Sequence, residues 1–194
     1  MKTHVITVHG FNVFDAGKNT VAKILPYFHQ KDISIEVFDY GYFNIFNPRW
    51  RNQKIADKLS ERIRDLNSIG YKVIIVAHSN GCTITHKTKD CVIDCAIYIN
   101  PALDRWRAFP KSIKQAHVWY SSSDILLWIS KFLPFHSWGA MGCFGYRGRF
   151  DSRITNFDKQ NDYEVSSKSH SDVFKDEKIK FFGPLITEKA LSTI

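Results

Sequence analysis

The chain has 194 residues, 44% of them hydrophobic and 24% charged, which is an ordinary balance for a globular protein and excludes a disordered chain. No repeat, low-complexity tract or flexible linker divides it, so we expect a single domain over residues 1–194 with a sizeable core. The formal net charge of +8 favours contact with acidic partners, but the basic residues are scattered, so we do not expect binding to nucleic acid.

The sequence carries no signal for export, membrane insertion or metal binding. The apolar patch at the N-terminus is too short for a signal peptide, and the longest uncharged stretch, residues 132–146, is interrupted by proline and glycine. The cysteines have neither CxxC pairing nor the spacing of metal ligands with histidine: Cys82, Cys91, Cys95 and Cys143. We therefore expect free thiols, a cytoplasmic location, no cofactor and no metal.

Strand and helix patterns alternate in the first part of the chain. An apolar strand is expected over residues 4–8, followed by a helix over 18–28 and a second strand over 33–40. The segment 51–69 predicts an amphipathic helix that ends at Gly70, with one apolar stripe formed by Ile55, Leu59, Ile63, Leu66 and Ile69. Strands separated by helices in this way indicate βαβ units with parallel pairing.

The third strand leads into a turn that carries a candidate nucleophile. The β-branched residues 73–76 are typical of a strand buried on both faces, and the sequence AHSNG follows over residues 77–81. A sharp turn here lifts the Ser79 hydroxyl clear of the backbone and needs the small residues Ala77 and Gly81 on either side. The pattern alone is weak, because an ordinary strand-to-helix turn with a capping serine has the same residues. Its position after a buried strand strengthens it.

The second part of the chain continues the alternation. A helix is expected over residues 80–89, strands over 95–100, 117–120 and 154–157, and a terminal helix from Ser171. Together the elements predict an α/β fold, a three-layer sandwich with a mostly parallel sheet of about six strands. Ligands bind at the carboxyl ends of the strands in such sheets, and the candidate functional residues follow strand ends.

Candidate partners of Ser79 occur in the chain order serine, acid, histidine. A serine hydroxyl needs a base to take its proton, and the base needs an acid to orient it. Asp124 follows a strand after a serine-rich loop, and His170 lies in the polar loop before the last helix. The carboxylate of Asp124 is also suited to cap the next helix, and Asp104 is the alternative acid. His136 lies in an aromatic segment, where packing or pocket lining is expected instead.

Two backbone amides are candidates for an oxyanion hole. Acyl transfer needs donors for the negative charge that develops on the carbonyl oxygen, and backbone N–H groups can supply them. Asn80 follows the candidate nucleophile directly, and Phe11 lies in the loop His9-Gly10-Phe11 after the first strand. We expect the amides of Phe11 and Asn80 to form this site.

These motifs together resemble those of the α/β-hydrolases, in their lipase- and esterase-like branch. The resemblance spans nearly the whole chain: HGF after the first strand, AHSNG at the turn, then Asp124 and His170. It implies a serine hydrolase, esterase-, lipase- or thioesterase-like, that cleaves a small-molecule or lipid acyl ester through an acyl-enzyme. Ala77 replaces the usual first glycine of GxSxG, and the first strand corresponds to the family's third, which implies a compact sheet.

Residues 125–150 form an aromatic-rich insertion between the candidate acid and the last strand. Trp128, Phe132 and Trp138 are candidates for substrate binding within it, and basic residues are interleaved with them. One interpretation is a lid or acyl-pocket wall, which also allows peripheral contact with a membrane. The other is that these aromatic residues fill out the core.

A second hypothesis for the whole chain is a catalytically silent module of the same fold that binds an acidic partner. The basic charge is its only support, and the ordered serine, acid and histidine argue against it. A nucleotide-binding doubly wound fold has no support, because neither GxGxxG nor a Walker-type loop follows a strand.

Overall fold

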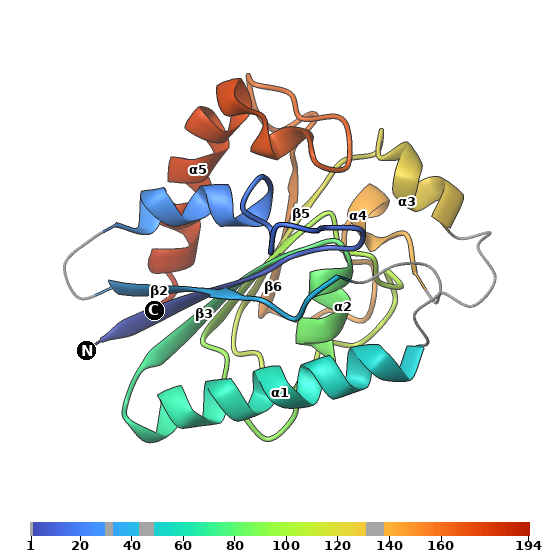
Figure 1. Cartoon of the computed structure of the whole chain (residues 1–194). Coiled ribbons are helices and arrows are strands. Elements are labelled where there is room, and N and C mark those ends of the chain that lie inside the picture. The colour runs from blue at the N-terminus through green and yellow to red at the C-terminus, as the bar shows by residue number, and fades with distance from the viewer. Residues whose placement is uncertain (1, 30–32, 43–48, 131–137) are drawn as a thin grey trace.

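A parallel β-sheet organises the chain in the computed structural model, which describes residues 2–29, 33–42, 49–130 and 138–194 (Figure 1). Within these residues the sheet has six strands in the order β2-β1-β3-β4-β5-β6, and every neighbouring pair is parallel. The strands are β1 (Thr3–Val8), β2 (Ile33–Phe38), β3 (Lys72–His78), β4 (Cys95–Ile99), β5 (Ala116–Tyr120) and β6 (Ile154–Asp158). The predicted α/β sandwich with a six-stranded sheet is confirmed.

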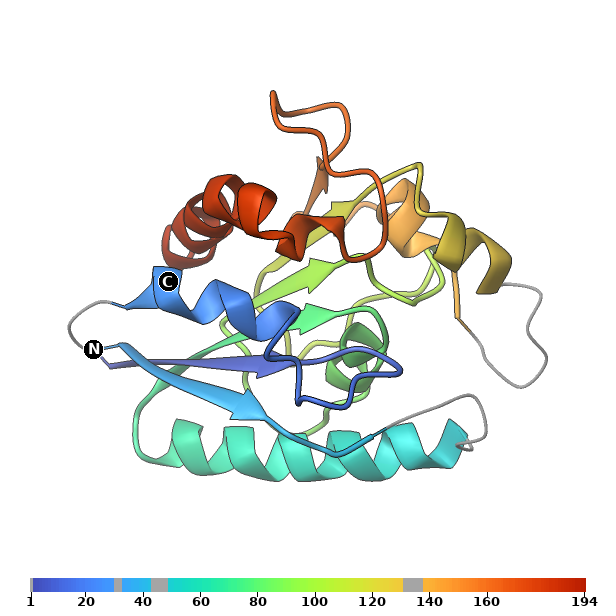
Figure 2. The same cartoon turned by 45° about the horizontal axis from the view of Figure 1, so that its top comes forward.

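Helices cover both faces of the sheet, as the two views together show (Figure 2). On one face lie α1 (Arg49–Ser68) and α2 (Asn80–His86), and on the other lie the 3₁₀-helix η1 (Val21–Phe28) and α5 (Asp176–Leu191). Alternate residues of β3 point to opposite layers: Val73 and Ile75 belong to the core under α1, whereas Ile74 and Val76 belong to the core under α5. This two-sided burial explains the unbroken apolar run of the strand.

Three short helices follow β5 and β6. They are α3 (Ile125–Ser130) and α4 (Met141–Phe144), which follow β5, and the 3₁₀-helix η2 (Asp172–Phe174), which follows β6. Within the described part of the 125–150 insertion, some side chains are buried and others are exposed. Met141 and Cys143 are fully buried, whereas Ile125, Leu126 and Trp128 are exposed on α3.

Several boundaries differ from the sequence expectations for local reasons. The segment expected as an α-helix over 18–28 is the 3₁₀-helix η1, because Pro26 has no N–H to donate and its ring opposes α-helical continuation. The helix after the turn ends at His86, and the terminal helical region is divided into η2 and α5. In α1 the predicted stripe is buried except for Ile69, which lies beyond the helix end and is 70% exposed.

All four cysteines are buried thiols that form no disulfide, as expected. Within the described residues, no group of three or more candidate ligands could hold a metal ion. No helix of the described chain combines the length and apolar character that a membrane crossing requires.

The contrast between Ile63 and Ile69 tests the packing of α1 on the sheet. Ile63 is fully buried in the core under α1, so Ile63→Ala should lower the free energy of unfolding by about 2–5 kcal/mol through lost burial and a residual cavity. Ile69→Ala removes an exposed side chain and should change it by less than about 0.5 kcal/mol. Urea denaturation of the two variants measures both values, and equal losses would contradict this packing.

Candidate active site

The turn after β3 holds Ser79 in a strained backbone conformation. Its φ of 54° and ψ of −120° lie outside the regions that non-glycine residues favour, and strain of this kind persists only where the surroundings enforce it. The enforcement comes from a close approach at Gly81, where an added Cβ would lie 2.3 Å from the carbonyl oxygen of Val8 and 2.5 Å from that of His9. The small residue expected at this position is therefore a steric requirement.

Asp124 and His170 are joined by a hydrogen bond. His170 Nδ1 lies 2.7 Å from Asp124 Oδ2, and the Asp124 side chain is fully buried. The other carboxylate oxygen, Oδ1, accepts from the amide of Leu127 at 3.2 Å, so Asp124 also caps the first turn of α3. Because the carboxylate accepts at Nδ1, a neutral His170 ring carries its proton there and Nε2 is the basic nitrogen.

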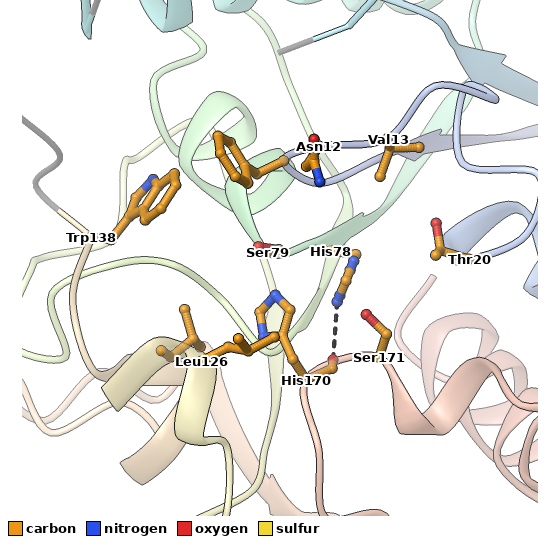
Figure 3. Close-up of a pocket in the computed structure, with 11 residues that line it drawn as sticks. Asn12, Val13, Thr20, His78, Ser79, Leu126, Trp138, His170 and Ser171 are labelled. Atoms are coloured by element: carbon orange, nitrogen blue, oxygen red, sulfur yellow. Dashed lines mark hydrogen bonds between the residues drawn. The ribbon is translucent and has the colours of Figure 1, made fainter. Parts of the chain in front are cut away.

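The loop that carries His170 is held by the residue before the candidate nucleophile. His78 Nε2 donates a hydrogen bond to the His170 carbonyl oxygen at 3.1 Å, drawn as the dashed line in Figure 3. Burial lowers the pKa of His78 well below its usual value, and the proximity of His170 lowers it further. The His78 ring is therefore a neutral structural donor, and His170 is the other histidine that lines the cavity.

Ser79 and His170 line the same cavity, which has a volume of about 470 Å³. In Figure 3 a ring nitrogen of His170 faces the Ser79 side chain. No hydrogen bond joins the Ser79 hydroxyl to His170 in the part of the chain that the structure describes. Such contacts are often long before substrate binds, so this arrangement is compatible with a serine and base pair.

The loop after β1 passes directly against Ser79. A Cβ added at Gly10 would lie 2.9 Å from Ser79 Cβ, which brings the following Phe11 to the cavity wall. The Tyr40 hydroxyl lies 2.8 Å from the carbonyl oxygen of His9 and 2.9 Å from that of Gly10, so it can donate to either and hold this loop in place.

The second candidate oxyanion donor begins α2. As the first residue of that helix, Asn80 has a backbone N–H with no intrahelical acceptor. Its side chain is fully buried and forms a reciprocal amide pair with Asn52, with distances of 3.0 and 3.1 Å. This pair ties the start of α2 to α1, so the Asn80 amide is rigidly placed beside Ser79.

Of the other candidates from the sequence, Trp138 lines the cavity, whereas Asp104 and Trp128 do not. Asp104 is exposed, and its carboxylate accepts from the amide of Trp106 rather than from a histidine. Trp138 lines the cavity and packs edge-on against Phe11, with ring centroids 4.9 Å apart. Trp128 is 51% exposed and does not line this cavity, because α3 turns Leu127 inward instead. Phe132 and His136 lie outside the described residues.

Sequence reasoning missed the buried polar residues that support this site. Tyr40 and Asn52 hold the loop after β1 and the start of α2, as described above. Asn100 donates to Asp124 Oδ2 at 2.6 Å, and the fully buried Lys159 contacts Asn100 in turn. Tyr40, Asn100 and Lys159 all follow strands within two residues, so a polar residue just past a buried strand was the available signal.

Solved structures of similar fold belong to proteins described as hydrolases. A hormone-sensitive lipase from a metagenome library matches 99% of this chain and 78% of its own, with 12% identity and a TM-score of 0.59. A YdeN-like hydrolase from Pectobacterium atrosepticum matches 100% and 93%, with 13% identity and a TM-score of 0.56. A protein described as a hydrolase of the α/β superfamily, from Xanthomonas campestris, matches 98% and 99%, with 13% identity and a TM-score of 0.54.

A further match covers only part of a larger protein. Phospholipase PlaB from Legionella pneumophila matches over 52% of this chain, with 20% identity and a TM-score of 0.41, and the match spans 25% of that protein. No protein-family model and no curated protein matches the chain. The full-length similarities show that the chain has the α/β-hydrolase fold.

The close approach at Gly81 predicts a strong effect of one methyl group. Gly81→Ala places its Cβ against two backbone carbonyl oxygens, which cannot move aside as a side chain would, so α2 must shift. We expect the free energy of unfolding to fall by about 1–3 kcal/mol, measured by urea denaturation. An unchanged stability in Gly81→Ala would contradict the contact.

Proposed function

We propose that this protein of α/β-hydrolase fold is a serine hydrolase that cleaves acyl esters, in the manner of an esterase, lipase or thioesterase. The hydrogen bond between Asp124 and His170, in the cavity that also holds Ser79, carries the proposal. A buried carboxylate that orients an imidazole beside a serine hydroxyl is the arrangement that serine acyl transfer needs. The hydrolases of similar fold support it at the level of the fold.

In the proposed reaction, Ser79 Oγ attacks the ester carbonyl carbon while His170 Nε2 takes the hydroxyl proton. Asp124 accepts the hydrogen bond from Nδ1 and stabilises the imidazolium that forms. The backbone amides of Phe11 and Asn80 bind the oxyanion of the tetrahedral intermediate. His170 then gives its proton to the leaving alcohol or thiol, and a water activated by His170 releases the acid from the acyl-enzyme.

The lining of the cavity favours an apolar acyl group. Beyond the polar residues of the site, the wall is formed mainly by hydrocarbon side chains: Phe11, Val13, Leu126, Leu127 and Trp138. A volume of about 470 Å³ accommodates a medium-sized apolar group. In Figure 3 Trp138 and Leu126 lie on one side of Ser79, and Thr20 and Ser171 lie on the other. The reacting carbonyl is placed at Ser79, and the acyl chain extends toward Trp138 and Leu126.

Peripheral contact with a lipid surface is a further part of the proposal. The exposed fractions of Ile125, Leu126 and Trp128 on α3 are 69%, 64% and 51%, and Leu126 also lines the cavity. Apolar side chains of this kind insert into the interfacial region of a bilayer, and a net charge of +8 favours anionic lipids. An acyl substrate could then pass from the lipid to the cavity.

Labelling by a fluorophosphonate tests the proposed nucleophile. The probe should modify the wild type at Ser79, and Ser79→Ala should abolish labelling and reduce ester turnover by a factor on the order of 10⁴ or more, because no other group replaces the attacking oxygen. Ser152→Ala, which removes an exposed hydroxyl outside the cavity, should label normally. A folded wild type that neither labels nor turns over esters would favour the silent module that binds an acidic partner.

Vesicle binding tests the exposed face of α3. Burial of the Ile125 and Trp128 side chains in the bilayer should contribute about 2–4 kcal/mol to the free energy of partitioning. The double variant Ile125→Ser with Trp128→Ser loses part of this contribution, so its partitioning onto phosphatidylglycerol vesicles should be weaker by about tenfold. Turnover of a water-soluble ester should be unchanged, since neither residue lines the cavity. Ile69→Ser removes an equally exposed residue from the connection between α1 and the start of β3, and this variant should bind as the wild type does.

A further inference from the structure

Lys159 is a lysine without solvent contact, placed directly behind the candidate acid. It follows β6 immediately, and its backbone N–H donates to the carbonyl oxygen of Tyr120 at the end of β5. Its side chain has no exposed surface, which is rare for lysine because an ammonium group loses its hydration when it is buried. A buried ammonium of this kind needs specific partners, and Lys159 has them.

The Lys159 ammonium begins a chain of hydrogen bonds that ends at the imidazole. Lys159 Nζ donates to Asn100 Oδ1. Asn100 Nδ2 donates to Asp124 Oδ2 at 2.6 Å, and that same oxygen accepts from His170 Nδ1 at 2.7 Å. The three linked residues follow three different strands: Lys159 follows β6, Asn100 follows β4 and Asp124 follows β5. They lie together because the carboxyl ends of parallel strands meet on one side of the sheet.

The charges at the two ends of Asn100 determine which way its amide points. Its Oδ1 lies against the ammonium of Lys159, and its Nδ2 lies against the carboxylate of Asp124. A flipped amide would place Oδ1 against the Asp124 carboxylate and the NH₂ group against the ammonium, so both contacts would become repulsive. The positive charge on Lys159 thus favours the orientation that supports Asp124, and so does the Gly142 carbonyl oxygen, which lies 3.5 Å from Asn100 Nδ2.

We propose that Lys159 is a positioning residue for the hydrolysis: its ammonium group orients the Asn100 amide, which holds the Asp124 carboxylate against His170. This role rests on the proposed serine hydrolase activity and adds a requirement to it. The site then works as a unit of five side chains, in which the protonated form of Lys159 is the competent one.

The surroundings of Lys159 allow its proton to be lost at moderately alkaline pH. Burial lowers its pKa to about 8, although three carboxylates oppose this shift. The charged and titratable groups around it are Asp124, Asp158, Asp172, Lys178 and the neutral His78. A neutral amine holds the Asn100 carbonyl oxygen less firmly than an ammonium, so the support of Asp124 weakens as pH rises through this value.

The pH profile of ester turnover tests this role. The wild type should lose kcat with an apparent pKa near 8 on the alkaline side, with KM changing less than kcat, because the lost contact orients the acid and not the substrate. Lys159→Met should have a kcat lower by a factor on the order of 10–100 at neutral pH, without that alkaline limb. Lys159→Arg keeps its charge at this pH and should retain activity above pH 8.

Controls separate this role from folding and from the proposed function itself. Lys180→Met removes an exposed lysine of α5 and should keep the wild-type profile. Circular dichroism and cooperative melting identify variants that fold, and if Lys159→Met does not fold, the pH profiles of the wild type and of Lys159→Arg decide.

A wild-type rate that stays level from pH 7 to above 9, or an alkaline limb that persists in a folded Lys159→Met, overturns the role of Lys159 alone. A wild type without any turnover overturns the serine hydrolase proposal with it.

Discussion

The close approach of two neighbouring strand ends is the constraint on which the rest of the site depends. β1 and β3 are paired with Val8 opposite Ala77, so the chain leaves both strands at the same level of the sheet. The turn at Ser79 and the loop at Gly10 then occupy one small volume, with room only for glycine at positions 10 and 81. The strain at Ser79 is the consequence, and it presents the hydroxyl to the cavity.

A second requirement is that the polar groups buried at the carboxyl ends of the strands form hydrogen bonds with one another. Asp124 and Lys159 have no exposed surface, and each has a partner of suitable charge or hydrogen-bonding capacity through Asn100. The Asn52–Asn80 amide pair meets the same need on the other side of the turn. Removing any one member of such a network lowers the stability of the fold, because the remaining polar groups stay buried without hydrogen-bond partners. They therefore also fix the geometry around His170.

The sequence by itself determined the layered fold and the chain order of the site. Buried strands with unbroken apolar runs, such as β3, and helices with one apolar stripe, such as α1, depend on periodicities that need no tertiary information. Ser79, Asp124 and His170 could be chosen because each follows a strand, and parallel strands bring such residues to one edge. Phe11 and Asn80 as oxyanion donors followed from the same positions and remain part of the proposal.

Only the tertiary structure decided which residues support these groups and which aromatic side chains point into the cavity or toward solvent. The outward position of Trp128 depends on the packing of its neighbour Leu127, which a local pattern does not contain. The 3₁₀ form of η1, by contrast, follows from Pro26, a local feature of the sequence. Lys159 is separated from Asn100 by 59 residues, and a lysine in a sequence is ordinarily exposed. Its burial follows from the pairing of β5 with β6, because long-range strand order, rather than local residue preference, sets which strand ends meet.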